Sequence, residues 1–278
     1  MQFIDLKKQQ KFIRDSLDQR IKEVLDKGQY IGGEEIRLFE SKLSSYSGVK
    51  HSIGCSNGTD AIMLALLALG VKPGDGVITV PFTYIATLEA IASIGAVPVL
   101  VDVYDSTFNM NPDLIEDVIN KSKIDIKAIM PVDLFGLPAR YRLVNEIARK
   151  HSLKVVADAA QSFGASKSNQ FVGTFADITT TSFFPAKPLG CYGDGGAVFT
   201  NNNDYNDILR SLAVHGKGSD KYDNIRVGMN SRLDTLQAAI LLEKIKIFKN
   251  EVVLRNEIAN LYKQKLNHIS DITFQTIP

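Results

Sequence analysis

Lys187 has the surroundings in this sequence that best suit covalent chemistry. It lies in the segment Phe184-Pro185-Ala186-Lys187-Pro188, where the two prolines prevent regular helix or sheet hydrogen bonding. The lysine is therefore expected on a tight, aromatic-rich connection between two strands. A lysine in a partly apolar loop can have a lowered pKa and act as a nucleophilic amine, as Schiff-base chemistry requires. Taken alone, a surface-exposed lysine is the commoner alternative.

Asp158 closes the apolar run at residues 153–157. A carboxylate at the carboxyl end of a central parallel strand points into the crevice where such sheets bind ligands. A buried anion there suits the task of holding a pyridine nitrogen protonated. An N-cap for a short following helix is the alternative interpretation.

The segment Ser56-Asn57-Gly58-Thr59-Asp60 lies between an expected strand and an expected helix. Backbone N–H groups at a helix start bind phosphate, and a hydroxyl in the first turn adds a donor. Simple helix capping by Ser56 or Asn57 is the alternative. The sequence lacks the Gly-x-Gly-x-x-Gly motif of nicotinamide cofactor sites and the P-loop motif of nucleotide triphosphatases.

Aromatic residues follow in Pro81-Phe82-Thr83-Tyr84, at an expected strand-to-helix turn. A ring at this position could stack on a planar cofactor, although core packing is the commoner use. The four histidines are scattered along the chain and form no metal-ligand spacing, so no metal site is predicted.

An alternation of strands and helices must position these residues. We expect apolar strands at residues 51–55, 76–80, 97–101, 128–132, 153–157, 178–184 and 196–200. We expect helices at residues 60–69, 84–94, 112–119, 141–150 and 204–213, and a long one from residue 234. Strands that read as apolar runs and alternate with helices predict an α/β fold with a large, mainly parallel sheet.

The two ends of the chain are predicted to begin a smaller domain. Residues 1–27 and 34–46 have helical spacing, and Gly28 supplies a stop for the first helix. We expect an N-terminal helix at 1–30, a large cofactor-binding domain at 31–234 and the start of a small C-terminal domain at 235–278. Because the sequence stops soon after an expected strand at 272–274, the small domain is expected to be incomplete.

Composition excludes several classes of protein. The chain has 278 residues, 45% of them hydrophobic, and a net charge of +1. This near-neutral balance gives no footprint for nucleic acid or an anionic membrane, and neither a signal peptide nor a membrane span is recognised. The two cysteines, Cys55 and Cys191, are too few for a disulfide framework and predict reduced thiols in a cytoplasmic protein.

The order of the chemical signals is more specific than any one of them. A phosphate-binding helix start, a stacking aromatic, a strand-end aspartate and a loop lysine follow one another as in fold-type-I pyridoxal 5'-phosphate (PLP) enzymes, the aspartate aminotransferase-like transferases. The sequence resembles the DegT-type sugar aminotransferases from Phe3 to its last residue. The stretches that carry the resemblance are residues 3–6, 28–31, 57–61, 81–84, 158–165, 182–185, 187–190, 193–196 and 230–234.

The resemblance implies roles for individual residues. Lys187 would form the Schiff base with PLP. The other implied cofactor contacts are Asp158 to the pyridine nitrogen, Gln161 to the phenolic oxygen, Gly58, Thr59 and Ser182 to the phosphate, and Tyr84 stacked on the ring. In a homodimer with shared active sites, Asn230 would reach the partner's phosphate and Arg232 the partner's sugar, while Gly28 and the Ala186 backbone would contact substrate. Arg226 and Arg232 are candidates for binding a uronate carboxylate.

The implied activity is transfer of an amino group, with glutamate as donor, to a 3-keto nucleotide sugar for O-antigen or other surface polysaccharide, including lipopolysaccharide. Two features depart from the family pattern: Ala186 stands where close relatives often have serine, and the relatives continue well beyond Pro278. A non-catalytic remnant that only dimerises or binds cofactor is therefore the alternative. The related sugar dehydratases replace the lysine with histidine, and Lys187 argues against that activity.

Overall fold

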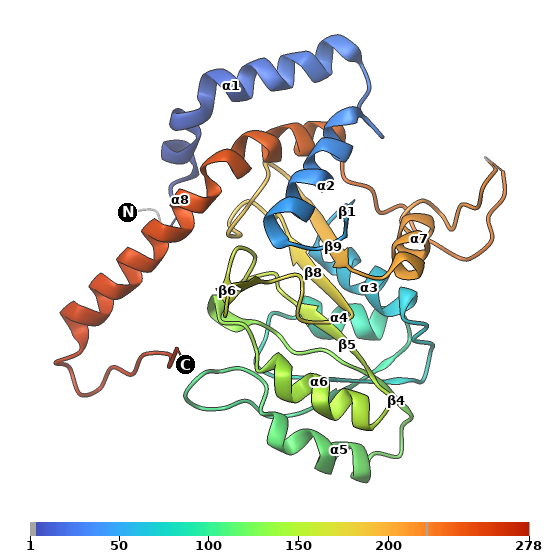
Figure 1. Ribbon diagram of the computed structural model, residues 1–278, viewed down its shortest axis with the longest axis vertical. Coiled ribbons are helices and arrows are strands. Elements are labelled where there is room, and N and C mark those ends of the chain that lie inside the picture. Colours follow the sequence, from blue (N-terminus) through green and yellow to red (C-terminus); the bar gives the residue numbers. More distant parts are fainter. Residues whose placement is uncertain (1–3, 221, 278) are drawn as a thin grey trace.

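The computed structural model describes residues 4–220 and 222–277, and at its centre lies a seven-stranded sheet (Figure 1). The strand order is β1-β9-β8-β5-β4-β2-β3. The strands are β1 (His51–Cys55), β2 (Gly76–Thr79), β3 (Val97–Leu100), β4 (Ile126–Ile129), β5 (Lys154–Asp158), β8 (Ile178–Ser182) and β9 (Gly196–Thr200). β9 pairs antiparallel with β1 and β8, and the other pairs are parallel. The predicted mainly parallel α/β sheet is confirmed.

Helices cover both faces of this sheet. They are α1 (Leu6–Lys27), α2 (Glu34–Ser47), α3 (Gly58–Ala68), α4 (Ala86–Ser93), α5 (Ile115–Lys121), α6 (Tyr141–Lys150), α7 (Asn203–Leu212) and α8 (Thr235–Leu266). Helices α3, α4 and α7 pack on one face, and α2 and α6 pack on the other (Figure 1). Each helix expected from the sequence is present, with ends shifted by a few residues.

The apolar strand runs follow from burial on both faces. In β2, Val77 packs with the α3 and α4 cluster, whereas Ile78 packs with the α5 and α6 cluster. In β9, Val198 belongs to the first cluster, and Phe199 packs with α2 and α8. Because successive side chains point to opposite faces, burial on both sides favours apolar residues at successive positions of a strand.

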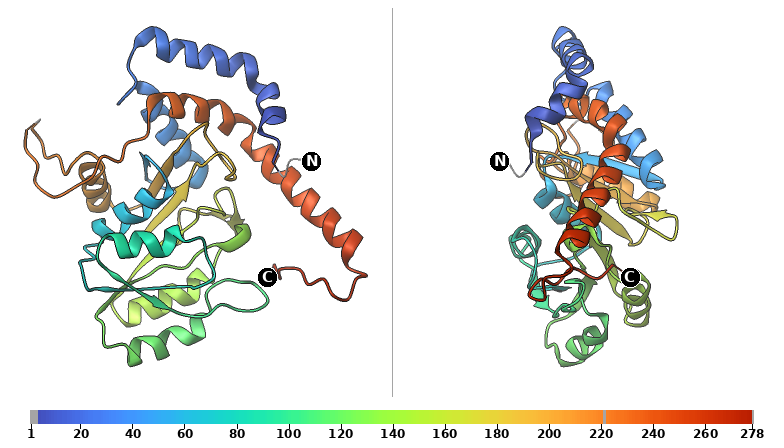
Figure 2. Two further views of the ribbon diagram at one scale, coloured as in Figure 1. Left: turned by 180° about the vertical axis from the view of Figure 1, so that it is seen from behind. Right: turned by 90° about the vertical axis from the view of Figure 1, so that its left-hand side faces the viewer.

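Helix α1 lies along α8 at the edge of the molecule (Figure 2). It ends at Gly28, whose φ of 65° is the left-handed conformation that glycine adopts at a helix end. The two helices are joined by an ion pair of 3.0 Å between Arg20 and the buried Glu243. This packing agrees with the prediction that both ends of the chain belong together, although the domain boundaries at residues 30 and 234 stay a prediction.

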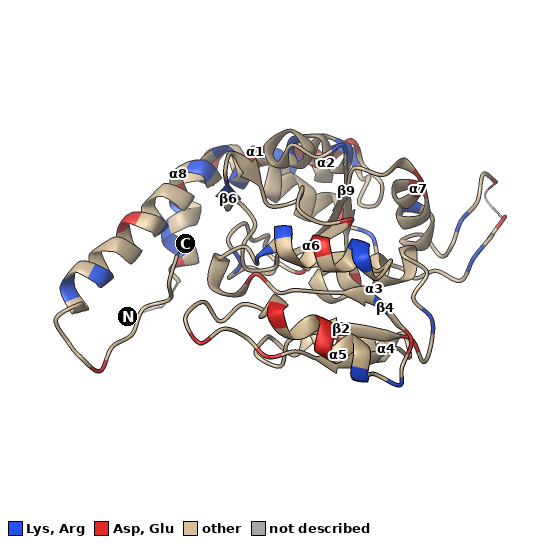
Figure 3. Cartoon of the chain, turned by 60° about the horizontal axis from the view of Figure 1, so that its bottom comes forward, with Lys and Arg blue, Asp and Glu red and all other residues tan. Residues whose placement is uncertain are grey.

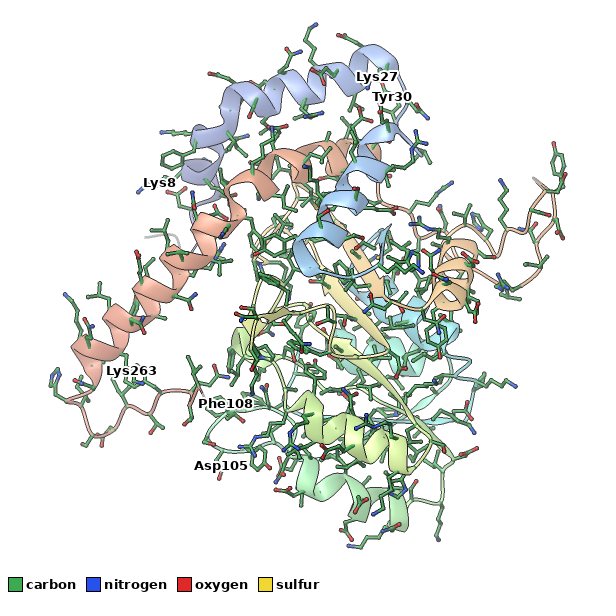
Figure 4. All side chains as sticks on the ribbon, in the orientation of Figure 1. Lys8, Lys27, Tyr30, Asp105, Phe108 and Lys263 are labelled. Carbon is green, nitrogen blue, oxygen red and sulfur yellow. The ribbon has the colours of Figure 1, made fainter. Side chains whose placement is uncertain are left out.

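The expected strand at residues 272–274 is wrong. The segment is irregular, and it is held by side-chain hydrogen bonds from Gln275 Nε2 to the carbonyls of Thr107 (2.8 Å) and Leu134 (3.3 Å). The apolar residues of this segment alone did not distinguish a strand from an irregular segment that packs on loops. Figure 4 shows the loop with Asp105 and Phe108 facing this end of the chain.

Smaller differences concern the ends of strands, an additional hairpin and two residues that the structure does not describe. Residues 130–132 and 183–184 lie outside the strands to which they were assigned, and a two-stranded hairpin, β6 (Ser166–Lys167) and β7 (Gln170–Phe171), was not expected. Phe3, with which the first family-like stretch begins, and Pro278 lie outside the described residues.

Charged residues of both signs are interspersed along the chain (Figure 3), as the near-zero net charge predicts. Within residues 4–220 and 222–277, none of the helices has the length and apolar character needed to cross a membrane.

Candidate active site

A cavity of about 960 Å³ opens where the parallel strands end. Its wall includes segments that follow β1, β2, β4, β5 and β8, because parallel strands bring their carboxyl ends to one edge of the sheet. Eight of the residues predicted from the sequence line it. These are Gly58, Thr59, Tyr84, Asp158, Gln161, Ser182, Ala186 and Lys187.

Lys187 and Asp158 both line this cavity, and each charge affects the pKa of the other group. Burial lowers the pKa of the half-buried Lys187 amine, and the Asp158 charge raises it in part. Burial raises the pKa of Asp158, which is 5% exposed, while hydrogen bonds and Lys187 favour its ionised form. The commoner alternative, a lysine on the open surface, does not describe this residue.

Thr87 holds the Asp158 carboxylate and was missed by sequence reasoning. Its Oγ1 donates to Asp158 Oδ2 at 2.8 Å, and it is paired at the same distance with the Thr83 hydroxyl. The Ala160 amide donates to Asp158 Oδ1 at 3.2 Å. Thr87 lies on the buried side of α4. Because buried hydroxyls need a hydrogen-bond partner, a threonine at this position of the helix was the signal in the sequence that could have indicated its role. Asp158 therefore lies in the crevice and also makes a hydrogen bond within the turn that follows its strand, so both interpretations of this residue describe part of its environment.

The start of α3 forms the other end of the cavity. Asn57 caps the helix by accepting from the Asp60 amide at 2.8 Å, so the capping interpretation is correct for Asn57. The Gly58 and Thr59 amides belong to the helical turn whose N–H groups have no acceptor within the helix. A Cβ on Gly58 would lie 2.7 Å from Ser182 Cβ, so glycine permits the close approach of this turn to Ser182.

Gln161 and Tyr84 line two further parts of the wall. Gln161 Oε1 accepts from the Phe135 amide at 2.8 Å, so its Nε2 group is the remaining hydrogen-bond donor of this side chain. Phe135, with φ of 57°, also lines the cavity and was not predicted. The Tyr84 side chain is 68% exposed, so it is a wall residue and not part of the core.

Four residues predicted from the sequence, including Arg226 of the segment named below, lie outside the cavity. Gly28 ends α1, while Asn230 and Arg232 belong to the segment at residues 222–232, called the arm below. The arm extends away from the sheet (Figures 1 and 2). Asn230 pairs with Val214, and the Ser231 hydroxyl lies 3.2 Å from that of Ser56, so this inner end of the arm packs beside the segment that leads into α3. The assignment of Asn230 and Arg232 to the site of a partner stays a prediction.

The residues present fit PLP. The site combines an open helix start beside a serine hydroxyl for a phosphate, a buried carboxylate for a ring nitrogen, and a lysine of lowered pKa. Because Gly58 has no side chain, the first turn of α3 can approach Ser182 closely at this end of the cavity. This set of groups on a parallel sheet is typical of PLP-dependent enzymes.

Comparison with known proteins identifies the class more closely. The sequence profile of the DegT/DnrJ/EryC1/StrS aminotransferase family matches residues 11–278, and the chain belongs to this family. The UDP-2-acetamido-2-deoxy-3-oxo-D-glucuronate aminotransferase of Pseudomonas aeruginosa is 49% identical over 269 residues, which are 97% of this chain and 74% of that protein.

Solved structures agree with this membership. A DegT/DnrJ/EryC1/StrS aminotransferase from Brucella abortus is 48% identical, with a TM-score of 0.95 over 97% of this chain and 73% of that one. NtdA from Bacillus subtilis, solved with bound cofactor PMP, is 34% identical, with a TM-score of 0.93 over 100% of this chain and 64% of that one. The predicted family and fold class are confirmed.

Proposed function

We propose that this chain is a PLP-dependent aminotransferase that converts a 3-keto nucleotide sugar to the 3-amino sugar. The Lys187–Asp158 pair in one cavity carries the proposal, and the relative from P. aeruginosa supports UDP-2-acetamido-2-deoxy-3-oxo-glucuronate as the substrate. Glutamate is the proposed amino donor. Its amino group passes to the sugar, so that glutamate leaves as 2-oxoglutarate and the ketone at C3 becomes an amine.

The chain's own residues divide the chemical work. Bound PLP supplies an electron sink for the carbon that loses and gains protons. Lys187 Nζ, whose pKa is lowered by burial, releases its proton more readily than an exposed lysine and can therefore carry protons between substrate positions. Asp158, oriented by its hydrogen bond from Thr87, would supply the negative charge for the ring nitrogen.

Binding and orientation fall to the rest of the wall. We assign the phosphate to the Gly58 and Thr59 amides and the Ser182 hydroxyl, because an open helix N-terminus binds anions. Tyr84 would cover one face of the ring, and Gln161 Nε2 would donate to its phenolic oxygen. The Ala186 backbone and Gly28 would contact substrate.

The arm supports a homodimer with shared sites. Ile225 is 56% and Val227 93% exposed, and apolar side chains on an extended segment favour cover by another chain. We propose that the arm crosses to a second copy, where Asn230 approaches the phosphate and Arg232 the sugar of the partner's site. We also propose that the enzyme acts in the cytoplasm and that its product is used to make O-antigen or another surface polysaccharide.

One series of measurements tests this function. The protein is incubated with PLP, its absorbance is recorded, and borohydride reduction with peptide mapping locates the modified lysine, which we expect at Lys187. 2-Oxoglutarate release is then measured with glutamate and the 3-keto sugar nucleotide. A label on another lysine contradicts the site, and cofactor binding without amine transfer supports the cofactor-binding remnant instead.

A further inference from the structure

A second carboxylate lies at the strand end beside Asp158 but does not face the cavity. Asp133 follows β4 and is 0% exposed. Its side chain accepts three hydrogen bonds, from the Ala139 amide (2.9 Å), the Tyr141 hydroxyl (2.7 Å) and the Ser162 hydroxyl (2.7 Å). Such complete pairing is needed to keep a buried carboxylate in place.

The contacts of Asp133 join two chain segments that form the site. Its amide donates to the Asp158 carbonyl at 3.0 Å, and the Asp158 amide donates to the Pro131 carbonyl at 3.0 Å. Ser162 lies directly after Gln161, so the bond from Ser162 to Asp133 restrains the turn at residues 158–162. Asp158 is therefore bonded to Asp133 through its backbone, and Gln161 is next in the chain to a residue bonded to the Asp133 side chain.

We infer that Asp133 is a positioning residue, which holds Ser162 and thereby the turn that presents Asp158 and Gln161 to the cavity. The inference rests on the proposed function for the meaning of those two residues. Burial raises the pKa of Asp133 to about 6, but its three donors stabilise the ionised form in which both oxygens accept. A carboxylate that only stabilised the fold would not need to be bonded to this turn.

Two hydroxyl deletions provide a matched test. Ser162→Ala and Tyr141→Phe each remove one hydroxyl that lies 2.7 Å from Asp133, yet only Ser162 belongs to the cofactor turn. In cofactor-free protein, we expect amide hydrogen exchange at residues 159–163 to be about tenfold faster in Ser162→Ala, because local opening sets the exchange rate. Tyr141→Phe should leave exchange at these residues close to that of the wild type.

Cofactor binding provides the second readout. We expect the PLP dissociation constant of Ser162→Ala to rise about tenfold, the scale of one hydrogen bond to a charged group, with a shifted pH midpoint of the bound-cofactor absorbance. Asp133→Asn should act in the same direction. If Asp133→Asn does not fold, the Ser162→Ala measurement still decides.

Equal loss of melting temperature in Ser162→Ala and Tyr141→Phe, with wild-type exchange and PLP affinity in both, would overturn the inference and leave Asp133 a purely stabilising residue. Failure of the wild-type protein to bind PLP would contradict the proposed function instead. The exchange measurement on cofactor-free protein separates the two results.

Discussion

The strand ends and the arm contribute to the site in opposite ways. At the strand ends, the sheet itself brings Asp158, Ser182 and Lys187 to one cavity. The arm exposes Val227 almost completely, and Asn230 and Arg232, at its inner end, do not line that cavity. Residues fixed by the sheet can bind a cofactor within one chain, whereas residues on an extended segment need a second surface to act on.

The largest effect is expected at the strand ends. Lys187→Ala removes the amine that we propose attaches the cofactor and moves protons, so turnover should fall by about 10³-fold or more. Borohydride should no longer fix the cofactor to the chain. Lys127→Ala, at an exposed lysine paired with Asp125, is the control and should retain full turnover.

Mixing two inactive variants tests the arm directly. When Lys187→Ala and Arg232→Ala proteins exchange subunits, each hybrid dimer has one site that carries neither change. Because half of randomly formed dimers are hybrids, we expect about a quarter of wild-type turnover. Demonstrated subunit exchange without any recovered turnover would show that Arg232 acts within its own chain or not at all.

Asp158→Asn keeps the shape of the strand end and removes its charge. We expect turnover to fall about 10²-fold or more, as for loss of one key electrostatic group. Thr87→Val, which removes the 2.8 Å hydrogen bond to Asp158 and the contact with the Thr83 hydroxyl, should cost about tenfold. Near-normal turnover in Asp158→Asn would assign this residue to the local turn alone.

The sequence predicted the parts of this site that depend on the order of strands and motifs. Asp158 and Lys187 could be placed because apolar runs mark buried strands, and ligand sites follow the ends of such strands. Thr87 and Asp133 could not be placed, since their roles depend on hydrogen bonds between segments 71 and 29 residues apart. The wrong strand at 272–274 has the same cause, because Gln275 finds its partners in distant loops.

The pH dependence of stability sharpens the role of the strand ends. Burial raises the pKa of Asp133 from 3.8 to about 6, so between these values the native state keeps a proton that the unfolded chain releases. The contribution of Asp133 to the free energy of unfolding is therefore present at low pH and falls as pH rises through this window. From about pH 4 to pH 7, wild type should lose roughly 1–3 kcal/mol relative to Asp133→Asn. Urea unfolding of both proteins across this range measures the difference, and a constant difference would contradict the shift.

The smallest expected effect concerns Tyr84, which belongs to the cavity wall but is itself largely exposed. If its ring covers the cofactor, Tyr84→Ala should weaken PLP binding by about three- to tenfold, the scale of one aromatic contact. Tyr84→Phe keeps the ring and should bind PLP as the wild type does. Phe82→Leu is the matched control, because Phe82 packs edge-to-face with Phe108 and Phe135 at the neighbouring turn position. Equal weakening in Tyr84→Ala and Phe82→Leu would show that the turn as a whole, and not the Tyr84 ring, supports the cofactor.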